Sequence, residues 1–331
     1  MPESPLLQIV DLAKHFPLGG GILAKAKGWI KAVDGVSFTV SRGEIFGLVG
    51  ESGCGKTTLG RLILRLIEPT SGWIEFEGQN IFALNPKELS SLRRRMQIIF
   101  QDPYSSLDPR MKVYAIVTEP LRATRSLTRN QQQEAALAVL QKVGLRAADL
   151  SKYPHEFSGG QRQRIGIART LCVRPELIVA DEPVSALDVS IQAQVINLMV
   201  DLKEEFNLSY VFISHDLSVV EHICDRIAVM YLGTIVEQAA TQDFSLAPRH
   251  PYTRALLQAV PLPDPHRRVT SITMEGDVPN PIDPPQGCAF HPRCLYRFDQ
   301  CWLQKPSLVE AAPGHFVACW LNQGLGMKID E

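Results

Sequence analysis

Eight residues, GESGCGKT at 50–57, have the types and spacing that bind a chain of phosphates. They fit the pattern G-x-x-x-x-G-K-[ST], between a short apolar run and a stretch with helical spacing. Glycines let backbone N–H groups turn toward phosphate oxygens, and the start of a helix adds its positive dipole end. The pattern therefore predicts a phosphate-binding loop made of Gly50, Glu51, Ser52, Gly53, Cys54, Gly55, Lys56, Thr57 and Thr58.

Single side chains of this loop have separate expected roles. Lys56 is expected to reach the β- and γ-phosphates of a nucleotide, and the Thr57 hydroxyl is expected to ligate Mg²⁺. Cys54 is interpreted as a small packing residue. A glycine-rich turn with a chance lysine is the alternative that the loop alone leaves open.

A second apolar run, LIVADE at 177–182, ends in an acidic pair. Open α/β sheets bind their ligands at the C-terminal ends of their strands, where this pair is expected to lie. Asp181 is predicted to hold Mg²⁺, directly or through water, and Glu182 to polarise the attacking water. A solvated strand end is the alternative for the pair alone, but together with the phosphate loop it predicts ATP hydrolysis.

The elements that position these residues follow an α/β pattern from about residue 7 to residue 237. Helical spacing is clearest at 191–202. Residues 102–174 contain helical patterns, such as 131–144, and few strand-like runs, so they predict a helical insertion. Apolar runs predict strands at 32–40, 44–50, 177–183, 210–216 and 226–233.

The sequence changes in character after residue 238. Ten prolines lie between Pro248 and Pro292, which indicates turns and extended segments after one helix at 251–260. We therefore expect an ATPase domain at 1–262, with its helical insertion, and a C-terminal tail domain at 263–331.

Composition and charge narrow the function classes. The 331 residues include 34 basic and 35 acidic ones, which gives a net charge of −1. The chain therefore lacks the excess of basic residues that is typical of nucleic-acid-binding proteins. No stretch approaches the roughly 18 uninterrupted apolar residues of a membrane-spanning helix. The first residues, MPESPLLQIVDLAKHF, do not read as a secretory signal, and a cytosolic chain is expected.

Further motifs connect the chain to a known family. FSGGQRQR (157–164) resembles the signature motif of ABC ATPases and lies about 20 residues before the acidic pair. Gln101 in IIFQDP, the motif SALD (185–188) and His215 in ISHD follow in that family's order. The chain is thus identified as similar to the ABC ATPases, which implies a P-loop fold with a mixed sheet core and a helical subdomain.

The resemblance implies a dimer in which each nucleotide is held between two subunits. The P-loop of one subunit would bind ATP, and the partner's signature motif would close over it. It implies that Gln101 senses Mg²⁺ and water and that His215 braces the γ-phosphate and Glu182. Further residues expected at the nucleotide are Phe16, as a stack on adenine or else a core residue, and Ser158, Gly159, Gly160, Gln161 and Asp188.

Longer segments resemble the ATPases of oligopeptide and dipeptide importers. These are MQIIFQDPYSSLDPRM (96–111), RHPYTRALLQAVP (249–261) and GDVPNPIDPPQGCAFHPRC (276–294); residues 14–38 resemble the second of that family's paired ATPases. The resemblance implies a peripheral protein on the cytoplasmic face of the inner membrane. Its partners would be a homologous ATPase, two permease subunits and, indirectly, a substrate-binding protein. Importers of nickel or glutathione, and soluble ABC ATPases, remain alternatives.

Four of the seven cysteines lie in the tail, at Cys288, Cys294, Cys301 and Cys319. Five, six and seventeen residues separate them, wider than the tight pair of a structural zinc site. Such spacing also suits an iron–sulfur cluster, and resemblance to the importer family favours [4Fe–4S], with zinc and free thiols as alternatives. His291 or His315 is an alternative ligand in either metal site. We expect the cluster to fasten a tail that has few apolar anchors.

Overall fold

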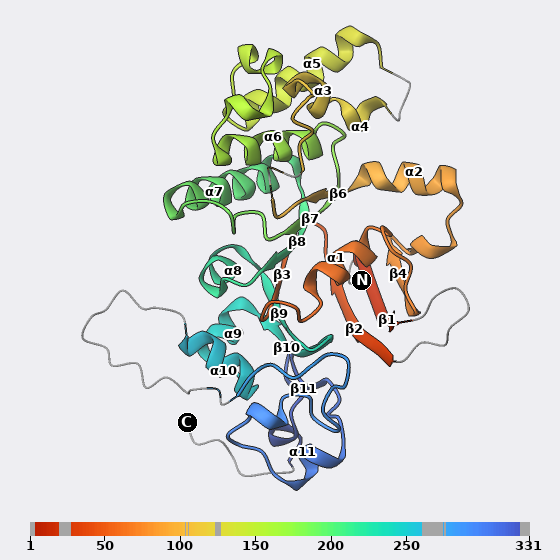
Figure 1. Cartoon of the computed structure of the whole chain (residues 1–331), viewed down its shortest axis with the longest axis vertical. Helices are drawn as coiled ribbons and strands as arrows, with labels where there is room; N and C mark the ends of the chain where they lie inside the picture. Colours follow the sequence, from red (N-terminus) through yellow and green to blue (C-terminus); the bar gives the residue numbers. More distant parts are fainter. Residues whose placement is uncertain are drawn as a thin grey trace, which may run out of the picture.

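The computed structural model describes residues 4–19, 28–102, 104, 106–122, 127–259, 274 and 276–324. Its central layer is an eight-stranded sheet (Figure 1), whose five strands β9, β3, β8, β7 and β6 run parallel. Strands β3, β7 and β8 are buried along their whole length, as their apolar runs predicted. In spatial order the strands are β11 (Val309–Ala312), β12 (His315–Val317), β10 (Thr234–Ala240), β9 (Arg226–Tyr231), β3 (Ile45–Val49), β8 (Ser209–Ser214), β7 (Leu177–Asp181) and β6 (Met96–Ile99).

A second, antiparallel sheet packs against this layer. Its strand order is β2-β1-β4-β5, and its long strands pair from Leu7 with Val40 to Leu18 with Gly28. Apolar residues of both sheets form one shared core cluster around helix α1. The strands of the second sheet are β1 (Leu7–Leu18), β2 (Gly28–Val40), β4 (Ser71–Phe76) and β5 (Gln79–Asn80).

Helices α3, α4, α5 and α6 lie within residues 102–174, where the sequence predicted a helical insertion (Figure 1). They pack on one another, and α6 also packs on β6 and α7. Two are α5 (Arg129–Lys142) and α6 (Gly159–Leu171), each with a capping box at its start. The other helices are α1 (Lys56–Ile63), α2 (Pro86–Arg95), α3 (Val113–Val117), α4 (Glu119–Arg122), α7 (Val189–Phe206), α8 (Leu217–Ile223), α9 (Thr241–Leu246), α10 (Pro251–Gln258) and α11 (Asp299–Leu303).

The C-terminal segment is attached to the central sheet. Its hairpin β11–β12 continues the sheet beyond β10, with Val317 opposite Glu237. The fully buried Glu237 carboxylate lies 2.6 Å from His315 Nε2 and accepts the backbone N–H groups of Arg249 and His250. These bonds join the hairpin to the segment before α10. The boundary that the sequence predicted at 262/263 lies outside the described residues and stays a prediction.

An aromatic cluster of Tyr231, Tyr252 and Phe290 anchors the same segment from another side. The ring centroids lie 4.8 Å apart for Tyr231 and Tyr252, 5.3 Å for Tyr231 and Phe290, and 5.4 Å for Tyr252 and Phe290. All three side chains are buried. Phe290 is thus an apolar anchor in a tail that was expected to have few, and it packs against the ATPase core rather than within the tail.

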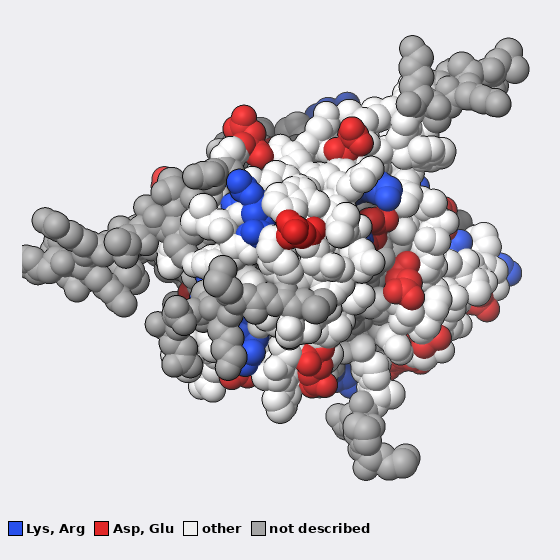
Figure 2. All heavy atoms as spheres, turned by 90° about the horizontal axis from the view of Figure 1, so that it is seen from below, with Lys and Arg blue, Asp and Glu red and all other residues white. Residues whose placement is uncertain are grey.

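Two surface properties follow from the described residues. None of the helices that the structure describes is long and apolar enough to cross a membrane. Figure 2 views the molecule from the end at which the C-terminal segment lies. Over the described surface of this end, Lys and Arg lie scattered among Asp and Glu rather than gathered in one basic patch.

Candidate nucleotide-binding site

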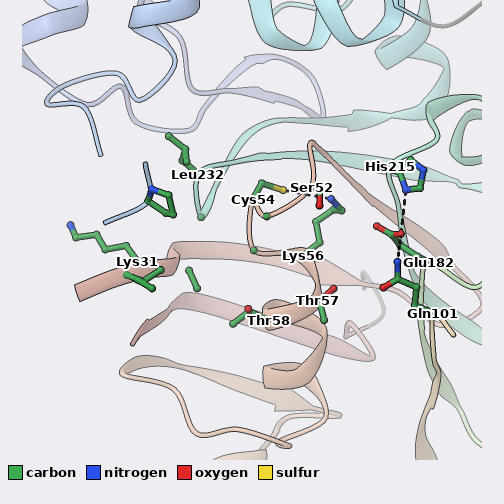
Figure 3. A pocket seen from close by; sticks show the side chains of 16 residues that line it. Lys31, Ser52, Cys54, Lys56, Thr57, Thr58, Gln101, Glu182, His215 and Leu232 are labelled. Carbon is green, nitrogen blue, oxygen red and sulfur yellow. Dashed lines mark hydrogen bonds and ion pairs between the residues drawn. The ribbon is translucent and has the colours of Figure 1, made fainter. Parts of the chain in front are cut away.

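A cavity of about 410 Å³ opens where the phosphate loop, Glu182 and strand β2 meet (Figure 3). The loop and the start of α1 form its floor, and the polar ends of β7 and β8 form one wall. It is lined by Ile30, Lys31, Ala32, Ser52, Gly53, Cys54, Gly55, Lys56, Thr57, Thr58, Gln101, Glu182, His215, Leu232, Gly233 and Pro281.

Two glycines are required by the shape of the loop. Gly55, directly before α1, has φ = 110°, and a Cβ there would lie 2.0 Å from the carbonyl oxygen of Ala32. Gly50 has φ = 151°, and its Cβ would lie 2.2 Å from the carbonyl oxygen of Met230. Neither position accepts a larger residue without displacing a backbone, so the motif's glycines fix the path of the loop.

The Lys56 side chain turns back into its own loop. It is buried, and Nζ donates to the carbonyl oxygens of Gly50 at 2.7 Å and Glu51 at 3.0 Å. Cys54 Sγ lies 3.8 Å from the same nitrogen. Burial raises the pKa of the Cys54 thiol, which fits a neutral packing residue. Lys56 is thus held at the floor of the cavity, where it can exchange carbonyl partners for phosphate oxygens.

Thr57, which lines the cavity, contacts Asp181, which is buried next to it. Thr57 Oγ1 donates to Asp181 Oδ1 at 3.1 Å. Burial raises the pKa of Asp181, and the Thr57 hydrogen bond partly opposes that rise. A hydroxyl beside a desolvated carboxylate is an oxygen donor set that suits Mg²⁺. Two of the three residues predicted at the magnesium ion, Thr57 and Asp181, therefore lie together and fit the ion, whereas the third, Gln101, is hydrogen-bonded to Glu182.

Glu182 lies at the centre of a small polar group. Its Oε2 accepts a hydrogen bond from Gln101 Nε2 at 2.8 Å and lies 3.2 Å from His215 Nδ1 (Figure 3). The Glu182 backbone is left-handed, with φ = 46°, a conformation that costs a non-glycine residue roughly 1–3 kcal/mol. Its N–H donates to the carbonyl of Ile213 in β8, which holds the strained turn. Three predicted catalytic residues thus meet at one cavity wall.

The signature motif lies apart from this cavity. Ser158 caps α6 and accepts from the N–H of Gln161, and its neighbour Gly159 is half-buried. Asp188 is exposed at the start of α7. None of these residues lines the cavity described above. Within one subunit the structure brings together the P-loop, the acidic pair, Gln101 and His215, but not the signature motif.

Phe16 is also outside the lining. It lies on β1 opposite Ile30, which does line the cavity, and Lys14 Nζ lies 5.1 Å from its ring centroid. Sequence patterns missed three residues that line the cavity: Lys31, Leu232 and Pro281. Leu232 and Pro281 belong to loops with no nucleotide motif, so only the fold brings them to the P-loop.

The four tail cysteines surround one small apolar cavity, together with His291 and aromatic side chains. All are free thiols, and the N–H of Cys288 donates to the carbonyl of Cys301 at 2.8 Å. Burial raises the pKa of Cys288 to about 11 and that of Cys319 to about 12, with the other thiols adding to the rise. Among the described residues, no group of three or more His, Cys, Asp or Glu side chains is arranged to hold a single metal ion.

Comparisons with known proteins agree with this geometry. The family described as "ABC transporter" matches residues 33–185, and the "Oligopeptide/dipeptide transporter, C-terminal region" matches residues 236–301. The chain is 52% identical over 314 residues to a "Probable peptide ABC transporter ATP-binding protein" of Sinorhizobium fredii, covering 95% of this chain and 89% of that one. It is 51% identical over 319 residues to the "Dipeptide transport ATP-binding protein DppF" of Haemophilus influenzae, covering 96% and 97%.

Solved structures support the same assignment. A dimeric ATP-binding cassette bound to ADP and Pi superposes with a TM-score of 0.63 at 27% identity, covering 71% of this chain and 98% of that one. CbiO1 from Clostridium perfringens, part of an ABC transporter complex, gives 0.62 at 26% identity, covering 73% and 90%. The chain therefore belongs to the ABC transporter ATP-binding proteins that carry an oligopeptide/dipeptide transporter C-terminal region.

Proposed function

We propose that this chain is the ATP-hydrolysing subunit of an importer of dipeptides or oligopeptides. The observation that carries the proposal is the combination of a cavity that brings the P-loop, Gln101, Glu182 and His215 together with a C-terminal region of the peptide-transporter type. Relatives that are 51–52% identical over nearly the whole chain are described as peptide import or dipeptide transport proteins. The chain would then work as a peripheral subunit on the cytoplasmic face of the membrane.

The residues of the cavity support a direct mechanism. The P-loop N–H groups and Lys56 would hold the β- and γ-phosphates, while Thr57 and Asp181 would hold Mg²⁺. Bound Mg²⁺ would neutralise the charge that develops on the phosphate oxygens. Glu182 would accept the hydrogen bond of the attacking water, with Gln101 and His215 fixing its carboxylate.

The proposed unit is a dimer. One chain holds one P-loop and one signature motif, and these do not share a cavity within the subunit. The exposed Ser158 and the free N–H groups at the start of α6 form an anion-binding end. We propose that this end, with Gln161 and Asp188, completes the partner's ATP site. A homologous ATPase is the proposed partner, giving a heterodimer.

A groove for the membrane subunits is available beside the helical insertion. A cavity of about 490 Å³ lies between α2 and the insertion, with the arginines Arg94, Arg95 and Arg174 beside apolar Leu121 and Leu127. Such a mixed lining suits a short amphipathic helix, whose apolar face enters the groove. The loop after Gln101, which resemblance to the importer ATPases also implicates in docking, is only partly within the described residues. We propose that the two permease subunits dock here.

Purification from native membranes tests the proposal. A tagged full-length chain is expected to recover two permease subunits and a second ATPase, and its deletion is expected to abolish uptake of labelled peptides. The variant Lys56→Ala serves as a matched control that should assemble normally without restoring uptake. Recovery of ribosomes or DNA in place of permeases would contradict the transporter role. Loss of nickel or glutathione uptake in place of peptide uptake would reassign the cargo.

We further propose that the tail cysteines hold a [4Fe–4S] cluster. Support comes from the shared cavity of Cys288, Cys294, Cys301 and Cys319 and from their free thiols. Ligands of a cluster contact separate irons, so four cysteines can bind it without the close grouping that a single ion needs. Among the alternative ligands, His315 is already paired with the buried Glu237, which leaves His291 as the histidine beside the thiols.

Metal analysis of anaerobically purified protein tests this site. We expect four iron and four sulfide per chain, with a visible absorption band that disappears in Cys294→Ser. Cys172→Ser is the matched control, because that buried cysteine lies in the helical insertion and should leave the band intact. One zinc per chain without iron would replace the cluster by zinc, and protein without metal would contradict both.

A further inference from the structure

Arg293 lies in the segment that contains the four tail cysteines (residues 288–319, the cysteine segment), and it contacts the phosphate loop. Arg293, which directly precedes Cys294, donates two parallel hydrogen bonds to the Glu51 carboxylate: Nη1 to Oε2 at 2.8 Å and Nη2 to Oε1 at 3.0 Å. The Arg293 side chain is only 7% exposed and that of Glu51 is 24% exposed. A bidentate pair in a partly desolvated place fixes geometry more strongly than a surface ion pair does.

A second bond from outside the loop reaches the same residue. The backbone N–H of Glu51 donates to the Tyr252 hydroxyl at 2.9 Å, and Tyr252 packs against Phe290 of the cysteine segment. The Glu51 carbonyl accepts from Lys56. Side chain and N–H are therefore held from the C-terminal side, while the carbonyl belongs to the nucleotide site. Glu51 is the link between the two regions.

Glu51 places a negative charge in a loop that must bind a polyphosphate. Its side chain is not among those that line the cavity, whereas the neighbouring Ser52 and Gly53 are. The guanidinium of Arg293 neutralises the carboxylate and holds it outside the cavity. Without this pairing, the carboxylate would repel the phosphates across a short distance and would be free to turn toward them.

We propose that Arg293 is a positioning residue for nucleotide binding, which acts by neutralising Glu51 and fixing the first half of the P-loop. The cysteine segment then sets the affinity of the ATPase for nucleotide through Arg293, Phe290 and Tyr252. This inference rests on the ATPase function proposed above. On this proposal the negative charge of Glu51 is compatible with phosphate binding because Arg293 neutralises it. Removing the charge of Arg293 should therefore weaken nucleotide binding, and removing the charge of Glu51 should not.

Binding of a non-hydrolysable ATP analogue to the full chain, measured by calorimetry, tests the proposal. Arg293→Gln is expected to weaken binding about tenfold, because an unpaired carboxylate remains beside the phosphates. Glu51→Gln is expected to bind as tightly as the parent protein or more tightly, because it leaves the positive charge of Arg293. The double variant is expected to recover the affinity of the parent. In ATP hydrolysis measured over a range of ATP concentrations, Arg293→Gln should raise KM but change kcat much less.

A purely structural clamp gives a different pattern, in which both single variants weaken binding equally and the double variant recovers nothing. That pattern, or unchanged affinity in Arg293→Gln, would overturn the proposal. Thermal unfolding is measured beside each titration. If Arg293→Gln does not fold, the comparison of Glu51→Gln with the double variant still decides: equal or tighter binding in both supports the proposal, and weaker binding in both contradicts it. Since nucleotide binding and ATP hydrolysis are measured rather than transport, failure of peptide import would not affect the result.

Discussion

At the scale of single residues, the cavity wall formed by Glu182, Gln101 and His215 depends on a local geometry that short sequence motifs only partly encode. Glu182 adopts a left-handed backbone that few non-glycine residues accept, and the strand end at Ile213 holds it there. The sequence predicted that Glu182, Gln101 and His215 share a site, because each belongs to a recognisable motif. The Arg293–Glu51 pair was not predictable, since 242 residues separate the two partners. Nothing in the pattern of the phosphate loop or of the tail cysteines indicates that they contact each other.

Glu182→Gln separates binding from hydrolysis at this wall. The amide keeps the shape of the side chain and can still accept from Gln101, but it no longer draws a proton from water. We expect ATP hydrolysis to fall by about 10²–10⁴-fold while nucleotide affinity stays near that of the parent. Steady-state phosphate release and analogue binding check the two halves. Parent-like turnover in this variant would remove Glu182 from its proposed role.

At the scale of elements, buried apolar strands were the easiest to predict and exposed antiparallel ones the hardest. Strands β3, β7 and β8 were predicted because burial on both faces gives continuous apolar runs. Strand β1 was missed as an element, since its mixed burial leaves a weak pattern and its pairing with β2 and β4 is decided by the fold. The hairpin β11–β12 was missed for the same reason.

The start of α10 contains a pH-sensitive element. His250 caps this helix with Nδ1 accepting from the N–H of Tyr252, and burial lowers its pKa to about 4, against a smaller opposing effect of Glu237. The folded state therefore resists protonation of His250 that the unfolded chain accepts below pH 6.5. The stability that neutral His250 contributes is complete above pH 6.5 and falls as the pH drops toward 4, by up to about 3 kcal/mol in all.

Urea unfolding between pH 6.5 and pH 4.5 checks this prediction. The variant His250→Asn keeps an oxygen that can cap the helix but has no ionisable group, so its stability should fall less steeply with acid. The slope is compared rather than the absolute value, because loss of the ring also removes packing against Phe290. Below pH 4.5 the comparison ends, since hydrogen bonds lower the pKa of the buried Glu237 despite the opposing effect of burial, and its protonation adds further acid destabilisation.

At the scale of the whole molecule, the chain is elongated, with different structures at its two ends (Figure 1). The helical insertion lies at one end and the cysteine segment at the other, with the ATP cavity between them (Figure 1). Contacts from the C-terminal side reach the P-loop through Glu51, and the cavity proposed to bind the permease lies between α2 and the insertion. The start of α6, with the signature motif, lies outside the ATP cavity. A single molecule therefore leaves the side of the cavity that the signature motif would cover open.

Gly159→Asp tests whether a second copy or a homologue supplies that wall. A Cβ at Gly159 would lie 3.6 Å from Leu187 Cδ2, an ordinary contact, and an acidic residue in the first turn of α6 favours the helix. The variant should therefore fold and bind ATP in its own P-loop. Its carboxylate would repel the γ-phosphate held by the partner, so ATP-dependent dimerisation in a Glu182→Gln background should disappear.

Gly159→Ala is the matched control and should still dimerise, whereas Gly160 is unsuitable because its Cβ would lie 2.4 Å from Ile191. Light scattering with and without ATP measures the outcome, and a dimer of Gly159→Asp as stable as that of Gly159→Ala would place the signature motif outside the interface.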